Sequence, residues 1–157
     1  MNTQIKTFDI IKKLKENNQK IATAESCTGG LLAAEITSIS GASEVFELGV
    51  VTYSNEQKSK ILGVSAQTLA EYGAVSAQTV IEMALSVAKL APADISVSIS
   101  GIAGPGGGTK NKPVGTVFIG ICKNQKAFAH EFHFLGNRDE VRRQTVESAL
   151  DLLTQLF

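Results

Sequence analysis

Two segments of this chain change abruptly from apolar residues to glycines and hydroxyl side chains. The first covers residues 24–30, with the sequence AESCTGG, and the second covers residues 98–109, with the sequence SISGIAGPGGGT. An apolar run that breaks in this way is typical of a buried strand whose chain leaves the sheet to meet a ligand. We therefore expect the two segments to form the walls of one pocket.

Apolar spacing and turn signals predict alternating helices and strands over the first hundred residues. Ile5, Phe8, Ile11 and Leu14 are three apart and predict an N-terminal helix with this stripe as its apolar face, ending at Asn17-Asn18. The elements expected next are a strand at 21–24, a helix at 29–37, a strand at 46–53, a helix from 54 or 55 to 63, a short helical turn at 65–73, a helix at 76–91 and a strand at 95–100.

The last third of the chain predicts a hairpin and a final helix. Two β-rich runs, 115–123 and 126–134, flank Asn124-Gln125, which is typical of an antiparallel hairpin. Asn137 and Glu140 have the spacing of a capping box at the start of the final helix. Strands that alternate with helices before a hairpin indicate an α/β fold, namely a three-layer α/β/α sandwich on a mixed sheet, as a single domain over 1–157.

Length and charge limit the class of protein and its partners. With 157 residues, 43% of them apolar and 19% charged, the chain has the composition of one globular domain. Its 15 basic and 15 acidic residues cancel, so we expect no nucleic acid partner. No apolar run reaches the roughly 18 residues of a membrane span, and the start is polar, which predicts no membrane contact and a cytoplasmic location. Two cysteines and two histidines without ligand spacing predict no metal site.

Four motifs in this order resemble the CinA family, specifically its C-terminal amidohydrolase domain. From the N-terminus they are the segment at 24–30, VTYSNEQK at 51–58, the segment at 98–109 and KPVGTV at 112–117. The resemblance implies hydrolysis of nicotinamide mononucleotide to nicotinate mononucleotide and ammonia, without a cofactor, and a homodimer. The family also contains longer proteins in which this domain follows another domain, so we expect the stand-alone form here.

Ser26 is the candidate nucleophile. Cleaving a carboxamide requires a nucleophile, a base, donors for the oxyanion and an acid for the departing ammonia. Ser26 follows a predicted strand, and the glycines after it let backbone N–H groups face an oxyanion or a phosphate. Local sequence alone favours a helix-capping role for this serine. Resemblance to the family motif favours catalysis instead.

Lys58 is the candidate base. His130 and His133 lie on one predicted strand at an odd separation, so they face opposite sides and form no catalytic triad. A lysine buried in a dry pocket loses its proton near neutral pH, and Lys58 lies about one turn into the helix that follows Tyr53. Tyr53 donates to the leaving nitrogen or links Ser26 to Lys58 in this scheme. By similarity to the family motif, Ser26, Tyr53 and Lys58 form the catalytic group.

A cysteine mechanism is the alternative chemistry. Glu25, Lys58 and Cys27 supply the residue types of a nitrilase-like amidase in which the thiol attacks. Alternating side-chain directions in an extended segment place Ser26 opposite Glu25 and Cys27, so only one register faces the ligand. Cys27 is then a small buried apolar residue, and Glu25 binds a ribose hydroxyl or orients Lys58.

The remaining candidates bind substrate. Arg138 and Arg142 are four apart on the final helix and together suit a phosphate, although nearby Asp139 and Glu140 offer a solvated ion-pair cluster as the alternative. The loop at 101–109 lacks the order of a P-loop, and the chain lacks a dinucleotide fingerprint, which disfavours ATP hydrolysis and redox cofactors. The full set of predicted substrate-binding residues is Glu25, Thr28, Gly29, Gly30, Asn55, Ser100, Gly101, Gly104, Thr109, Arg138 and Arg142.

A non-catalytic function is also consistent with these patterns. The same pocket could bind a pyridine nucleotide and serve as a regulatory or interaction module. A binder does not require Ser26, Tyr53 and Lys58 together, so their combined presence favours an enzyme.

Overall fold

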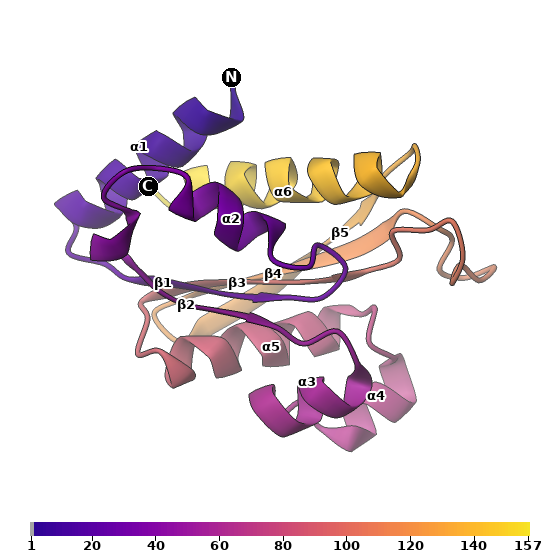
Figure 1. The fold of residues 1–157 in the computed structure, drawn as a ribbon. Helices are drawn as coiled ribbons and strands as arrows, with labels where there is room; N and C mark the ends of the chain where they lie inside the picture. Colours follow the sequence, from indigo (N-terminus) through magenta and orange to yellow (C-terminus); the bar gives the residue numbers. More distant parts are fainter. Residues whose placement is uncertain (1) are drawn as a thin grey trace.

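A five-stranded mixed sheet with the order β2-β1-β3-β4-β5 forms the centre of the computed structural model, which describes residues 2–157 (Figure 1). β1 (Ile21–Glu25) pairs in parallel with β2 (Phe46–Val51) and β3 (Ile95–Gly101). β4 (Thr116–Lys123) runs antiparallel to β3 and to β5 (Lys126–His133). The carboxyl ends of three neighbouring strands therefore meet at one edge, where ligands of open α/β sheets bind.

Helices cover both faces of the sheet and give the predicted three-layer α/β/α sandwich. α1 (Thr3–Glu16), α2 (Leu31–Thr37) and α6 (Arg138–Thr154) lie on one face (Figure 1). α3 (Asn55–Leu62), α4 (Ala66–Tyr72) and α5 (Ala77–Leu90) lie on the other. A short 3-10 helix (Ala42–Glu44) precedes β2. None of the helices within residues 2–157 has both the length and the apolar character needed to cross a membrane.

Capping residues fix where the helices begin. The side chains of Ser54, Ser65 and Ser76 each accept a hydrogen bond from a backbone N–H in the first turn of α3, α4 and α5. At the start of α6, Asn137 and Glu140 form the predicted capping box. The helix starts at Ser54, Ser76 and Asn137 are thus confirmed.

The predicted apolar stripe of the N-terminal helix is wrong for half of its members. Ile5 and Phe8 are 53% and 56% exposed, whereas Ile11 and Leu14 are buried with Thr7 and Ile10. A strict spacing of three residues falls behind the helical repeat by about 60° at each step, so a stripe of four ends on the opposite side of the helix. The buried residues follow the 7, 10, 11, 14 pattern that stays on one face.

Small residues let α5 lie close against the sheet. Ser96 and Ser98 of β3 donate to the backbone carbonyls of Ala84 and Val80 on α5. A Cβ atom at Gly120 of β4 would lie 2.3 Å from Ser98 Oγ and 2.6 Å from the Val80 carbonyl oxygen. The absence of a side chain at position 120 is therefore required for this layer to pack.

We expect Gly120→Ala to lower the free energy of unfolding by about 1–3 kcal/mol, because the added methyl group must push α5 away from the sheet. Urea unfolding monitored by circular dichroism measures the change. Gly106→Ala is the matched control, since nothing lies within 4 Å of its added Cβ. Equal stability of the two variants would contradict this packing argument.

Candidate active site

Ser26 and Lys58 meet at the carboxyl edge of the sheet. Ser26 directly follows β1, and Lys58 lies one turn into α3, the helix that follows β2. Lys58 Nζ donates to Ser26 Oγ over 3.0 Å and to the carbonyl oxygen of Thr52 over 2.8 Å. The Thr52 carbonyl thus fixes the amine beside the serine hydroxyl, and the two residues form a serine–lysine dyad.

The Lys58 amine is buried without an acidic partner. The residue is 2% exposed, and no carboxylate of residues 2–157 forms an ion pair with it. Burial lowers the pKa of Lys58 from its ordinary value of 10.5, because removal from water penalises the ammonium form. A larger share of Lys58 is therefore neutral near physiological pH than for a surface lysine, as a general base requires.

A pocket of about 270 Å³ opens onto this dyad. Both glycine-containing segments contribute to its wall, as the sequence predicted. The pocket residues with side-chain chemistry are Ser26, Cys27, Tyr53, Asn55, Lys58, Ser100 and Arg138, and the others are Ala74, Val75, Gly101, Ile102, Ala103, Gly104, Gly106 and Gly107. Its basic side chains are Lys58 and Arg138, and it contains no aspartate or glutamate. The pocket therefore favours a ligand that carries an anionic group.

Arg138 connects two sides of the pocket mouth. Its Nη1 donates to the carbonyl oxygen of Gly104 over 2.8 Å, and its Nη2 donates to the hydroxyl of Tyr53 over 2.7 Å. The Tyr53 side chain is 59% exposed. The hydroxyl of Tyr53 therefore interacts with Arg138 and does not link Ser26 to Lys58, which contact each other directly.

Glu25 stabilises the start of α2. Its carboxylate accepts hydrogen bonds from the Thr28 hydroxyl and from the backbone N–H groups of Gly30, Leu32 and Ala33. Glu25 is 1% exposed, and a negative charge at this place complements the positive end of the helix dipole. The predicted roles of Glu25 as a ribose ligand or as a partner of Lys58 do not fit this geometry. Thr28, fully buried against Glu25, also lies outside the pocket.

Arg142 lies outside the pocket, in contrast to the predicted phosphate clamp. Its Nε donates to the carbonyl oxygen of Cys27 over 3.1 Å, and its Nη2 donates to that of Thr28 over 3.2 Å. Only Arg138 of the predicted arginine pair lines the pocket. The two guanidinium groups share a helix face but do not bind at the same place. Arg138 contacts Gly104 in the loop after β3, whereas Arg142 contacts the loop after β1.

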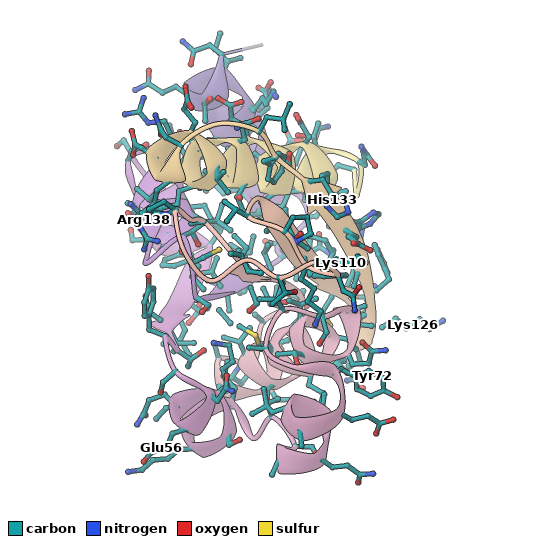
Figure 2. The ribbon with its side chains drawn as sticks, turned by 90° about the vertical axis from the view of Figure 1, so that its right-hand side faces the viewer. Glu56, Tyr72, Lys110, Lys126, His133 and Arg138 are labelled. Carbon is teal, nitrogen blue, oxygen red and sulfur yellow. The ribbon has the colours of Figure 1, made fainter. Side chains whose placement is uncertain are left out.

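Three further predicted binding residues also lie outside the pocket lining. Gly29 and Gly30 form the turn into α2, where their φ angles are 59° and 102°. Thr109 accepts a hydrogen bond from the backbone N–H of Lys112 in the outer part of the glycine-rich loop. In Figure 2 the adjacent Lys110 lies well apart from Arg138, which lines the pocket.

Cys27 lines the pocket but is a poor nucleophile. Burial raises the pKa of its thiol to about 11, so the thiol is protonated at neutral pH. The Lys58 amine forms its hydrogen bond with Ser26 rather than with the thiol. These two observations favour the serine over the cysteine alternative.

The structure also identifies residues that sequence reasoning missed. The carbonyl of Thr52 holds Lys58, and the pocket includes Ala74 and Val75, which precede the helix-capping Ser76. Thr52 lies within the VTYSNEQK motif, but a backbone carbonyl gives no signal in residue type. Nothing in the sequence of the short Ala74-Val75 segment predicts its place beside the β1 and β3 loops.

Metal ligands do not gather within the described part of the chain. Residues 2–157 contain no group of three or more His, Cys, Asp or Glu side chains placed to hold a metal ion. His133 contacts Glu131 on the same strand, with 2.9 Å between Nε2 and Oε1, and neither histidine lines the pocket.

Comparison with known proteins agrees with this architecture. Residues 4–157 match the model of the CinA C-terminal domain. The chain belongs to the CinA family. A CinA-like protein of Endomicrobium trichonymphae is 54% identical over 140 residues, which cover 89% of this chain and 33% of that protein. The chain thus spans about a third of the length of the curated CinA relatives it matches.

Solved structures of CinA-family proteins share the whole fold. The competence/damage inducible protein CihA of Agrobacterium tumefaciens is 40% identical with a TM-score of 0.95, and the match covers 98% of this chain and 94% of that one. The competence damage-inducible protein A of Klebsiella pneumoniae is 37% identical with a TM-score of 0.96, and the match covers 99% and 96%. These matches confirm the fold class and the family.

We expect Glu25→Gln to lower the free energy of unfolding by about 2 kcal/mol. A neutral amide has one acceptor oxygen and cannot replace a carboxylate that accepts four hydrogen bonds. Denaturant unfolding measures the loss. Glu35→Gln on α2 is the matched control, because Glu35 accepts a single side-chain hydrogen bond, from Thr7. A loss no greater than that of the control would show that Glu25 does not hold the helix start.

Proposed function

We propose that this CinA domain hydrolyses the carboxamide of nicotinamide mononucleotide to nicotinate mononucleotide and ammonia. The observation that carries the proposal is the 3.0 Å contact between Lys58 Nζ and Ser26 Oγ inside a pocket. A hydroxyl beside a buried amine of lowered pKa has the parts of a serine–lysine amidase. The choice of substrate rests on the motif resemblance and on a pocket that contains the guanidinium of Arg138 and no carboxylate.

Acylation uses the dyad directly. Neutral Lys58 accepts the hydroxyl proton of Ser26 while Oγ attacks the carboxamide carbon, which produces a tetrahedral oxyanion. Lys58 then gives this proton to the amide nitrogen, the C–N bond breaks, and ammonia leaves an ester on Ser26. The pyridinium charge of the substrate assists attack, because it withdraws electrons from the amide. Water attacks the ester with Lys58 again as base, which releases the carboxylate and restores the hydroxyl.

Backbone amides of the second glycine-rich segment are the better candidates for the oxyanion. The N–H groups of Gly29 and Gly30 already donate to the Ser26 carbonyl oxygen and to the Glu25 carboxylate. Ala103 and Gly104 line the pocket, and their N–H groups donate no hydrogen bond within residues 2–157. We assign the oxyanion to these two amides.

Arg138 is the proposed ligand of the substrate phosphate. It is exposed at the pocket mouth, and its guanidinium is already oriented by Gly104 and Tyr53. A planar guanidinium suits a phosphate through paired hydrogen bonds. In this arrangement the ring of Tyr53 lies at the pocket wall, and its hydroxyl orients Arg138 rather than moving a proton.

We expect ammonia release from nicotinamide mononucleotide, with lower kcat/KM for nicotinamide riboside and nicotinamide, because these lack the phosphate. Ser26→Ala abolishes turnover, since no other hydroxyl within residues 2–157 forms a hydrogen bond with the Lys58 amine, whereas Cys27→Ala retains it. A coupled ammonia assay in EDTA measures all three substrates and both variants. Saturable binding of the mononucleotide without ammonia would instead support the binding-module alternative. Loss of activity in Cys27→Ala alone would assign the attack to the thiol.

We also expect kcat/KM to rise with pH and then level off. Activity requires neutral Lys58, so the rise follows deprotonation and is centred on the pKa of Lys58 in the free enzyme, below the ordinary lysine value of 10.5. A pH–rate profile over the range in which the protein stays folded measures the midpoint. Lys58→Arg, which stays protonated, has no activity at any pH. A profile without a rise below 10.5 would remove Lys58 as the base.

A further inference from the structure

We propose that Arg142 is a positioning residue that holds the turn after β1, and with it the Ser26 hydroxyl, in the geometry needed for attack. The inference rests on the proposed role of Ser26 as nucleophile. It gives Arg142 a role distinct from binding phosphate, which its sequence position had suggested.

The contacts of Arg142 are made with the nucleophile turn itself. Its two hydrogen bonds end on the carbonyl oxygens of Cys27 and Thr28, which are the two residues directly after Ser26. These partners are 115 and 114 residues away in the sequence. A guanidinium presents its donors in a rigid plane, so two bonds from one group fix both the place and the orientation of the backbone it binds.

Glu25 binds the backbone amides that follow the same turn. The buried carboxylate accepts hydrogen bonds from the N–H groups of Gly30, Leu32 and Ala33. The segment after Ser26 therefore has its carbonyl groups bound by the cationic Arg142 and its amide groups bound by the anionic Glu25. Gly29 and Gly30 adopt left-handed φ angles and offer little intrinsic preference for this shape. A Cβ atom added at Gly29 would lie 3.4 Å from Arg142 Nη2, which places the guanidinium directly against the turn.

A phosphate role predicts a different kinetic effect from a positioning role. Arg142 does not line the pocket, whereas Arg138 does, so loss of Arg142 changes the reacting geometry rather than the contacts to substrate. Misplacement of a nucleophile lowers kcat and leaves KM nearly unchanged when chemistry is slower than substrate dissociation.

The test compares Arg142→Ala and Arg142→Lys with Arg143→Ala. Arg143 is the matched control, because it is exposed on the same helix, pairs with Asp139 at 2.8 Å and, among residues 2–157, donates no hydrogen bond to the carbonyls of the turn. Two quantities are measured: hydrogen exchange of the backbone amides at 29–32, and kcat and KM for nicotinamide mononucleotide. Exchange of α5 amides reports whether a variant remains folded overall.

In Arg142→Ala we expect exchange at 29–32 to accelerate by about tenfold, with α5 unchanged. We expect kcat to fall by roughly 10–100-fold, with KM within about twofold, and millimolar guanidinium to restore part of kcat. Arg142→Lys accelerates exchange at 29–32 and lowers kcat by smaller factors, since lysine keeps the positive charge but lacks the paired donors of the guanidinium. This variant also provides the test if Arg142→Ala does not fold. Arg143→Ala behaves as the unmodified protein.

Unchanged exchange at 29–32 in both Arg142 variants, or an increase in KM with kcat retained, would overturn the positioning role. Failure of the proposed function is a separate result. If the unmodified protein releases no ammonia, the amidohydrolase proposal fails, while hydrogen exchange still decides whether Arg142 holds the turn.

Discussion

The candidate site depends on one unfavourable placement, the burial of the Lys58 amine without a carboxylate partner among residues 2–157. An ammonium in this environment loses hydration, and a hydroxyl and a carbonyl oxygen replace only part of it. Because the pKa of Lys58 is lowered in the folded state, the unfolded chain binds more protons, so the destabilising effect of this residue shrinks as pH rises toward 10.5. A buried lysine therefore costs stability at neutral pH. The same energy keeps the amine available as a base beside Ser26.

Four segments that are distant in the sequence must be held together around this amine. Ser26 follows β1, Lys58 and Tyr53 flank the start of α3, the glycine-rich loop follows β3, and Arg138 begins α6. The parallel pairing of β1 with both β2 and β3 brings the first three to one edge of the sheet. The last is brought there by packing of α6 against α1 and α2 on one face. Two arginines of α6 then join the segments, Arg138 across the pocket mouth and Arg142 on the nucleophile turn.

Much of the fold could be predicted from the sequence, because its signals are local. Hydroxyl and amide caps, the Asn124-Gln125 turn and the apolar strands each act within a few residues, and the structure retains them. The site could be predicted in part, since Ser26, Lys58, Ser100 and Arg138 do line one pocket. The interpretations of Glu25 and Arg142 failed for a physical reason. A charged side chain near a candidate nucleophile can bind either a ligand or the protein backbone. Here the unpaired amides and carbonyls of the loop after β1 bind Glu25 and Arg142.

The sequence by itself determined the order of helices and strands, the helix starts and the family, because these follow from residue type and spacing along the chain. Only the tertiary structure decided which face of α1 is buried, that the Thr52 carbonyl holds Lys58, and that Cys27 carries a thiol of raised pKa. It also separated Arg138, at the pocket, from Arg142, at the nucleophile turn. The burial of a side chain and the partners of a long side chain depend on residues that are distant in the sequence. The partners of Arg142 are more than a hundred residues away from it, and no local sequence pattern indicates which of them it contacts.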